Sequence, residues 1–315
     1  MGQVVYAVLL SSIPKVGPRT YERLVSAFGS ACGAAMATPQ DHGAIGILNA
    51  TQVERLQKGL GDLPRLEAWL DELSFDGIAI RTTESRDYPE MLRLLPSAPP
   101  VLYVKGELPV SEELSVALVG TRSPTTEGVE MARAIAGRLS EAGLCVVSGL
   151  AAGIDAAAHE GALDAGGRTV AILGSGLLRV HPPENQPLAD RVVQQGALVS
   201  ECFPTEHTSV SRLMARNRLQ IAFSRAVIVV EMGDTRGSMA AVDQAVKQGR
   251  PVFAWVTDRD CPPAPGPRSL VEGKLAQPIR TLDDLAAVLD TVAAWSPPDL
   301  TDDSDEEPRP QLTLF

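Results

Sequence analysis

The sequence has few of the residues from which disulfide frameworks and metal sites are built. Its 315 residues include only four cysteines and four histidines. The cysteines lie far apart and form no Cys-x-x-Cys pair, and the histidines also lack the spacing of metal ligands. We therefore expect no disulfide framework and no bound metal, and this cysteine usage favours a reduced, bacterial-type cytoplasm.

Long apolar runs and a triphosphate-binding motif are also missing. No apolar run approaches the ~18 residues that a membrane-spanning helix needs. The short apolar run at residues 4–10 has no basic residue before it, so we expect no secretory signal. The pattern Gly-x-x-x-x-Gly-Lys-Ser/Thr does not occur, which excludes a P-loop ATPase.

A dinucleotide fingerprint is incomplete. Gly174-Ser175-Gly176 follows an apolar run, but Arg179 stands where the third glycine would be. No acidic residue follows in the expected context. We therefore expect no dinucleotide and no other cofactor.

The charge of the chain is acidic overall but unevenly distributed. The formal net charge is −11, which taken alone argues against nucleic acid. The acidic residues between 299 and 307 meet no basic residue, whereas four arginines between 207 and 230 meet no acidic one. These four are Arg212, Arg216, Arg218 and Arg225. An acidic protein with such a local arginine stripe can still hold a phosphate backbone.

The first 75 residues read as short helices without a strand pattern. Residues 13–20 join two apolar helical stretches and resemble the hairpin of helix-hairpin-helix modules, with Lys15 where such hairpins usually have their first glycine. The alternative is a small helical docking domain.

From Gly77 onward, apolar strands alternate with helical segments, which predicts a doubly wound, mostly parallel α/β sheet. The expected strands lie at 78–80, 101–104, 115–120, 144–148, 169–173, 197–201, 226–231 and 251–255. One of the helices is expected at 126–142, ending at Gly143. We therefore divide the chain into a helical helix-hairpin-helix/SAM-like domain (1–75), an α/β domain (76–292) and an acidic tail (293–315) that we expect to be disordered.

Glycines and polar residues follow several strands at the edge where ligands bind such sheets. Gly120-Thr121-Arg122 ends one strand, and its glycine would let backbone amides approach an anion beside an always-charged arginine. Ser148-Gly149 ends the next strand. The alternative for the first turn is a tight turn with a surface arginine. Asp155 and His159, four residues apart, are either an acid–base pair or an ordinary helical pair.

A second set of candidates lies further along the chain. Arg216-Asn217-Arg218 is expected to open the helix before the strand at 226–231, where its cations would add to the attraction of the helix dipole for anions. Gly237 and Ser238 are expected to begin a later helix and to form another anion-accepting rim. The alternative for the arginine run is a solvated helix start.

The order of these motifs resembles that of the DprA/Smf family. The matching segments cover about residues 1–290. They are Val119–Arg122, Ser148–His159, Ala165–Ala171, Leu173–Gly176, Val180–Asn185, Gly196–Glu201, Arg216–Arg218, Ser224–Glu231 and Gly237–Ser238. The resemblance implies an extended Rossmann fold and a homodimer without catalytic residues. It also implies a mediator that binds and protects single-stranded DNA and helps to load the RecA recombinase in natural transformation or repair.

Carried over by motif, Arg122 and Arg216-Asn217-Arg218 would bind phosphates. The rim would be shaped by Gly120, Ser148, Gly149, Gly174, Gly237 and Ser238. The sequence departs from the family pattern at Leu213-Met214, where members usually have an aromatic residue and proline that would stack on a base. It also departs at Ala152 and Arg236, and we expect no winged helix after Leu289.

The last five residues resemble the Gln-Leu-x-Leu-Phe peptide that docks on the bacterial sliding clamp. The anchors would be Gln311, Leu312, Leu314 and Phe315. An acidic tail with a terminal phenylalanine also resembles the tips of single-strand-binding proteins, and such a tether suits a recognition peptide. The alternative is a frayed end or a segment that packs on the chain itself.

Two other classes of function compete with this interpretation. The first is a small-nucleotide enzyme of the phosphoribohydrolase type, which shares a Rossmann-type fold. Such enzymes carry Pro-Gly-Gly-x-Gly-Thr-x-x-Glu, whereas the corresponding residues 233–241 lack the glutamate and the glycine pair. The second is a scaffold that links clamp and recombinase.

Overall fold

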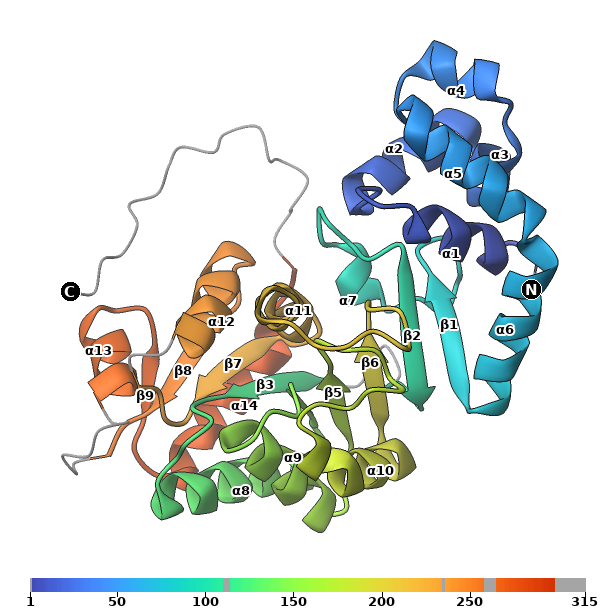
Figure 1. Ribbon diagram of the computed structural model, residues 1–315. Coiled ribbons are helices and arrows are strands. Elements are labelled where there is room, and N and C mark those ends of the chain that lie inside the picture. The colour runs from blue at the N-terminus through green and yellow to red at the C-terminus, as the bar shows by residue number, and fades with distance from the viewer. Residues whose placement is uncertain (1, 110–113, 234–235, 258–264, 298–315) are drawn as a thin grey trace.

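The computed structural model describes residues 2–109, 114–233, 236–257 and 265–297. A helical lobe packs beside a larger lobe built on one mixed sheet (Figure 1). The helical lobe contains α1 (Val4–Ser12), α2 (Pro18–Phe28), α3 (Ala31–Met36), α4 (Pro39–Ile45), α5 (Ala50–Gly61) and α6 (Leu63–Phe75). It contains no strand within residues 2–75, as its sequence predicts.

The hairpin between α1 and α2 follows from local backbone preferences. Lys15 has a positive φ of 66°, the left-handed conformation for which glycine is usually selected. Gly17 precedes Pro18, which begins α2 with the φ that a helix requires. The segment 13–17 therefore connects two helices, as the sequence predicts, with Lys15 in a left-handed conformation at the turn.

Within the described residues, the sheet has nine strands in the order β1-β2-β6-β5-β4-β3-β7-β8-β9. They are β1 (Ile78–Thr82), β2 (Val101–Gly106), β3 (Ser115–Val119), β4 (Cys145–Ser148), β5 (Thr169–Ile172), β6 (Ala197–Ser200), β7 (Ala226–Val229), β8 (Val252–Trp255) and β9 (Gln277–Ile279). From β6 to β9 the neighbours pair in parallel, whereas β1 and β2 extend the sheet through antiparallel pairing. The predicted doubly wound, mostly parallel sheet is confirmed. Only the short strand β9 was missed, because three residues carry too little pattern.

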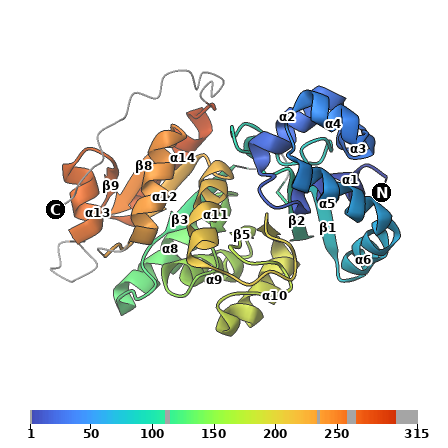
Figure 2. The same cartoon turned by 45° about the horizontal axis from the view of Figure 1, so that its top comes forward.

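Helices cover both faces of the sheet (Figures 1 and 2). They are α7 (Glu90–Arg93), α8 (Thr126–Glu141), α9 (Ile154–Asp164), α10 (Gln186–Gln195), α11 (Val210–Ala222), α12 (Arg236–Lys247), α13 (Pro265–Glu272) and α14 (Leu285–Ala294). Along β3, Val116 and Leu118 pack with α8, α9 and α14, whereas Ala117 and Val119 pack with α11 and α12. The continuous apolar strands thus reflect burial on both faces. After α8, Gly143 has the expected positive φ, 80°.

The two lobes share a hydrophobic core. Leu10 and Leu73 of the helical lobe belong to the same buried cluster as Tyr103 and Leu198 of the sheet. Between the lobes, the ring of Trp69 stacks on Phe203 with centroids 4.5 Å apart and an interplanar angle of 6°. This contact holds the helical lobe against the loop that follows β6.

The described part of the chain contains no helix with both the length and the apolar character that crossing a bilayer requires. Near its end, Trp295 donates from Nε1 to the carbonyl of Gly249 at 3.2 Å, and the guanidinium of Arg250 lies 3.9 Å from the centroid of its ring. Residues 298–315 lie outside the described ranges. The expectation of a disordered tail and the clamp-peptide residues 311–315 therefore lie outside them as well.

Candidate nucleic-acid interface

The chain reverses its direction of winding between β3 and β7, and Gly120-Thr121-Arg122 lies at the carboxyl end of β3 at this point. Ligands of open α/β sheets bind at such a switch point. The amide of Thr121 donates to the Glu231 carbonyl at 2.7 Å, and the hydroxyl of Ser238 donates to the Gly120 carbonyl at 3.1 Å. The loops after β3 and β7 and the start of α12 thus meet at one rim, which we call the switch-point rim.

The first helix at this rim already holds an anion, the side chain of Glu231. Its Oε2 accepts from the amide of Thr125 at 2.9 Å, and its Oε1 accepts from the Thr125 hydroxyl at 2.5 Å. Thr125 is the N-cap of α8, and a side chain on Gly128 would overlap the carboxylate. Helix N-termini attract anions, and cofactor phosphates often lie there. Here the chain supplies the anion itself. No local signal in the sequence assigns Glu231 this role, because its partner Thr125 lies 106 residues away.

Arg122 projects from the rim into solvent. Its side chain is exposed, and no hydrogen bond or ion pair joins it to another residue of the described ranges. Its charge lies near enough to Arg216 to help lower the pKa of that guanidinium. The charge of Arg216 is balanced by Asp155, whereas Arg122 is an exposed cation with no counter-charge among the described residues, which favours a bound anion.

The arginine run at 216–218 lies in the middle of α11, so the prediction that it opens the helix is wrong. The helix begins at Val210, and the Ser209 hydroxyl caps it by accepting from the amide of Arg212 at 3.2 Å. Serine is a favoured N-cap because its oxygen satisfies a free amide of the first turn. The three residues therefore lie beyond the first turn of α11, where the helix dipole no longer adds to their attraction for anions.

Arg216 is buried, with 5% of its surface exposed. Its Nη2 lies 3.5 Å from the Asp155 carboxylate and donates to the Gly149 carbonyl at 3.2 Å, and its Nη1 donates to Gln220. Burial lowers the pKa of Arg216 and raises the pKa of Asp155, while their mutual attraction opposes both shifts. A side chain on Gly149 would overlap the guanidinium. Gly149 thus provides the space in which Arg216 packs.

The arginine stripe contains no acidic residue in the sequence, but acidic side chains pair with two of its arginines in the structure. In the structure, Arg218 pairs with Glu201 at 2.5 Å and Arg212 pairs with Glu206 at 2.7 Å. Both glutamates lie in the loop after β6. Glu206 precedes Arg212 by only six residues, just outside the acid-free segment, whereas the fold brings Glu201 to Arg218 from 17 residues away. The inference that no acid neutralises the stripe is wrong for this reason.

The remaining predicted residues lie on α11, in the first turn of α12 and at the carboxyl ends of β4 and β5. Asn217 is 8% exposed and donates from Nδ2 to the Gly237 carbonyl at 3.3 Å. Gly237 has open space around it and, with Ser238, lies in the first turn of α12, as expected. The Ser148 hydroxyl is buried and donates to the Leu118 carbonyl at 2.7 Å. Gly174 lies below Leu213, whose Cα would be 3.0 Å from an added side chain.

Asp155 and His159 form neither an acid–base pair nor a simple helical pair, because each has another partner. Asp155 faces Arg216, whereas Nδ1 of His159 lies 2.7 Å from the Thr169 hydroxyl oxygen. That hydroxyl donates to the Val146 carbonyl, so Nδ1 of His159 carries the proton and donates. Burial lowers the pKa of His159 to about 3, with the charge of Arg216 acting in the same direction. The ring is therefore neutral at physiological pH.

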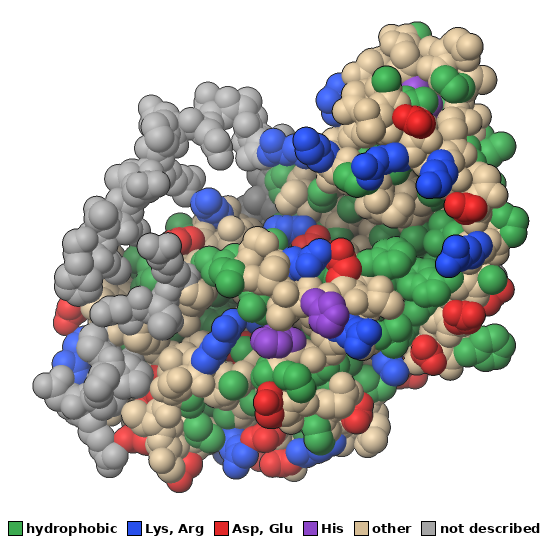
Figure 3. Space-filling model, viewed as in Figure 1, with side chains coloured by type: hydrophobic (Ala, Val, Ile, Leu, Met, Phe, Trp, Pro, Cys, Tyr) green, Lys and Arg blue, Asp and Glu red, His purple; other side chains and the backbone are tan. Residues whose placement is uncertain are grey.

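Further basic and histidine side chains gather on the face over α11 and its neighbouring loops, beside a hollow between the lobes (Figure 3). Arg179, His181 and His207 are exposed on the loops after β5 and β6. Arg179 was predicted only as a departure from the dinucleotide fingerprint, not as a residue of this basic face. That Arg179 follows a glycine turn at the same sheet edge as Arg122 was the available signal.

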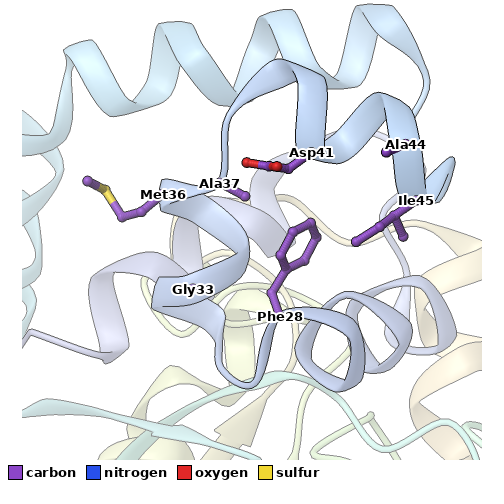
Figure 4. Close-up of a pocket in the computed structure, with 7 residues that line it drawn as sticks. All are labelled: Phe28, Gly33, Met36, Ala37, Asp41, Ala44 and Ile45. Carbon is purple, nitrogen blue, oxygen red and sulfur yellow. The ribbon is translucent and has the colours of Figure 1, made fainter.

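A different hollow, of about 450 Å³, lies in the helical lobe. It is lined by Phe28, Gly33, Met36, Ala37, Asp41, Ala44 and Ile45 (Figure 4). Its lining includes no basic side chain, and its one carboxylate, Asp41, accepts from the Thr38 amide at 3.0 Å. This apolar hollow therefore lacks the charge that a phosphate backbone requires.

The profile of the DNA recombination-mediator protein A family matches residues 79–290. The chain belongs to this family. It is 34% identical over 272 residues to protein Smf of Synechocystis, covering 84% of this chain and 68% of that protein. It is 34% identical over 211 residues to DprA of Bacillus subtilis, covering 67% and 70%.

Two solved structures of the DprA family share the fold. DprA from Streptococcus pneumoniae aligns with a TM-score of 0.78 and 27% identity, over 90% of this chain and 97% of that one. DprA from Helicobacter pylori, described with its single-stranded DNA binding mode, aligns with a TM-score of 0.61 and 27% identity, over 67% and 95%. The extended Rossmann-like fold that the motifs imply is therefore confirmed.

Leu213 and Met214 occupy the place where the DprA pattern would have an aromatic residue. Leu213 packs over Gly174, and Met214 is 37% exposed on α11. Neither side chain offers an aromatic ring on which a base can stack. Ala152, the second departure, is exposed, and the side chain of Arg236 lies outside the described part of the structure.

Proposed function

We propose that this DprA-family recombination mediator binds single-stranded DNA along the carboxyl edge of its sheet, with Arg122 as the central phosphate contact. One observation carries the proposal. Arg122 is exposed and has no partner among the described residues, while the adjacent helix N-terminus is filled by Glu231. Such a rim suits a phosphodiester backbone passing over it better than a single cofactor phosphate.

The predicted residues divide into two roles under this proposal. Arg122, Asn217 and Arg218 contact the strand, with Gly120, Gly237 and Ser238 forming the surface over which it passes. Arg216 and Gly149 support this surface from below, as do Ser148 and Gly174, because their side chains or backbone are packed inside. The bound strand would therefore lie over a surface that the buried side chain of Arg216 holds in place from below.

We further propose that the protein acts without catalysis. The titratable groups nearest the rim are engaged: Asp155 faces Arg216, His159 is neutral and buried, and Glu231 caps α8. None of the three is placed to exchange a proton with a ligand at the surface. The rival phosphoribohydrolase activity has a direct test. Incubation with nucleoside monophosphates should release no free base, and release of base would overturn this part of the proposal.

The DNA site is tested by titrating a labelled oligo-dT against the wild-type protein and Arg122→Ala. The variant should bind more weakly at low salt. The slope of log affinity against log salt should also be shallower by roughly 0.7, the value for one phosphate contact on a single strand. Arg138→Ala is the matched control, because Arg138 is also exposed but lies in the last turn of α8. Equal affinities of wild type and Arg122→Ala would refute the assignment.

The family resemblance also leads us to propose three partners: a second copy of the chain, the RecA recombinase and the sliding clamp. The protein would form a homodimer, protect the strand and load RecA on it, in natural transformation or repair. Sedimentation tests the dimer, and RecA-filament assembly on DNA coated with single-strand-binding protein tests loading. Deleting residues 311–315 should abolish clamp capture while leaving DNA binding unchanged. Capture that survives the deletion would contradict the clamp proposal.

A further inference from the structure

We propose that a cavity between the two lobes binds one unstacked nucleobase, and that it selects a base with an exocyclic amino group. The cavity has a volume of about 430 Å³ and lies between the end of α1, the start of β2 and the loop after β6. We call it the interlobe cavity. The proposal rests on the proposed function, because the strand held at the rim would deliver the base.

Two carboxylates line the interlobe cavity, and each has one oxygen in use. Glu201 accepts from Arg218 at Oε2, and Glu206 accepts from Arg212 at Oε1. The other oxygen of each accepts no hydrogen bond from the described residues. Each arginine both orients its carboxylate and balances its charge. The cavity therefore offers hydrogen-bond acceptors without a net negative charge that would repel a nucleic-acid strand.

A hydroxyl in the same lining also lacks a partner. Ser11 Oγ is buried and forms no hydrogen bond within the described part of the chain. Buried polar atoms are nearly always satisfied by protein, water or a ligand. Ser11 can donate to, or accept from, a polar edge that enters the cavity.

The other walls suit the flat, apolar face of a base. Val8, Pro99, Tyr103 and Phe203 contribute apolar or aromatic surface. Stacking on Trp69 holds Phe203 in place, and the Tyr103 ring meets Phe203 edge-on with centroids 6.0 Å apart. This wall is therefore preorganised. The volume of the interlobe cavity lies within the roughly 300–1,000 Å³ range of small-ligand sites.

The interlobe cavity lies along the path proposed for the strand. Glu201 directly follows β6, which is separated from β3 by β5 and β4. Three inter-strand steps at about 4.8 Å correspond to roughly 14 Å between the ends of β3 and β6. A strand that contacts Arg122 and then Arg218 would thus reach the cavity. The cavity would supply the base contact that Leu213-Met214 lacks.

The free acceptors determine which bases fit. Cytosine and adenine present an amino donor, whereas thymine presents a carbonyl oxygen at the corresponding place. That oxygen would face carboxylate oxygens without a proton between them. We therefore expect oligo-dC to bind the full-length protein about 3- to 10-fold more tightly than oligo-dT, the effect of one additional hydrogen bond. Dimethylation of cytosine N4 removes the donor and should abolish this preference.

Two substitutions of Ser11 test whether the preference for dC arises in the interlobe cavity. Ser11→Phe would fill the interlobe cavity and should remove the preference for dC while leaving the affinity for dT unchanged. Ser11→Ala removes only the hydroxyl and should retain most of the preference, and thermal unfolding checks that both variants are folded. Equal binding of dC and dT by the wild type would overturn the proposal, as would a preference that survives in folded Ser11→Phe. Failure of the proposed function is distinguishable, because Arg122→Ala would then leave the affinity for every oligonucleotide unchanged.

Discussion

The guanidinium of Arg216 lies 3.5 Å from the carboxylate of Asp155, with side chains only 6% and 9% exposed. This ion pair joins α11 to the start of α9 beneath the switch-point rim. It exists because Gly149 has no side chain to occupy the position of the guanidinium. The rim that presents Arg122 therefore rests on a buried charge pair.

Gly149→Ala should destabilise the protein strongly, because the methyl group would displace Arg216 and separate it from Asp155. Breaking a buried ion pair costs about 3–5 kcal/mol, measured as the change in free energy of unfolding in urea. Gly237→Ala is the control, since an added methyl group has open space around it. The control should change stability by no more than about 1 kcal/mol. Similar stabilities of the two variants would contradict the role assigned to Gly149.

Acid should destabilise the fold through His159. Its pKa is lowered to about 3 by burial, against an ordinary value of 6.5, so the unfolded chain takes up this proton first. Stability is therefore complete above pH 6.5 and is lost as the pH falls toward 3, at up to about 1.4 kcal/mol per pH unit.

His159→Asn tests the assignment, because the amide can still donate to Thr169 but does not titrate. Urea unfolding between pH 7 and 5 should show that the variant loses less stability per pH unit than the wild type. The reason is that the variant takes up about one proton fewer on unfolding. Comparing the two slopes cancels the contribution of carboxyl groups, including the raised pKa of Asp155. Parallel slopes would show that His159 does not titrate as proposed.

Removing the carboxylate at the start of α8 should destabilise that helix. Glu231→Ala leaves the Thr125 amide and hydroxyl without their acceptor, which costs on the order of 1–3 kcal/mol. A double-mutant cycle with Thr125→Val isolates the coupling, which should exceed 0.5 kcal/mol for groups in direct contact. Additive effects of the two substitutions would mean that the contact contributes little to stability.

The helical lobe should loosen when the stack between Trp69 and Phe203 is removed. Trp69→Ala should raise amide hydrogen exchange in α1 and α6 before it affects the central strands, because the interface opens without global unfolding. Trp69→Phe, which keeps an aromatic ring, is the matched comparison and should retain most of the protection. Unchanged exchange in Trp69→Ala would show that the shared core alone holds the lobes together.

Much of the fold was accessible from sequence because its signals are local. Continuous apolar runs such as Ala226–Val229 indicate strands buried on both faces, and glycine turns mark their carboxyl ends. The order of the motifs then identified the family. The short strand β9 and the start of α11 were missed or misplaced, since three residues carry no periodicity and the cap at Ser209 was not recognised.

The candidate site was only partly accessible for a different reason. Sequence alone determined that Arg122 follows a strand at the binding edge of a parallel sheet, because the position depends on local chain geometry. Tertiary structure alone decided that Arg216 is buried against Asp155, that Glu201 pairs with Arg218, and that Glu231 accepts hydrogen bonds at the start of α8. A charge pair depends on distance in space, and folding brings Arg216 to Asp155 and Arg218 to Glu201 although the partners lie far apart in the sequence.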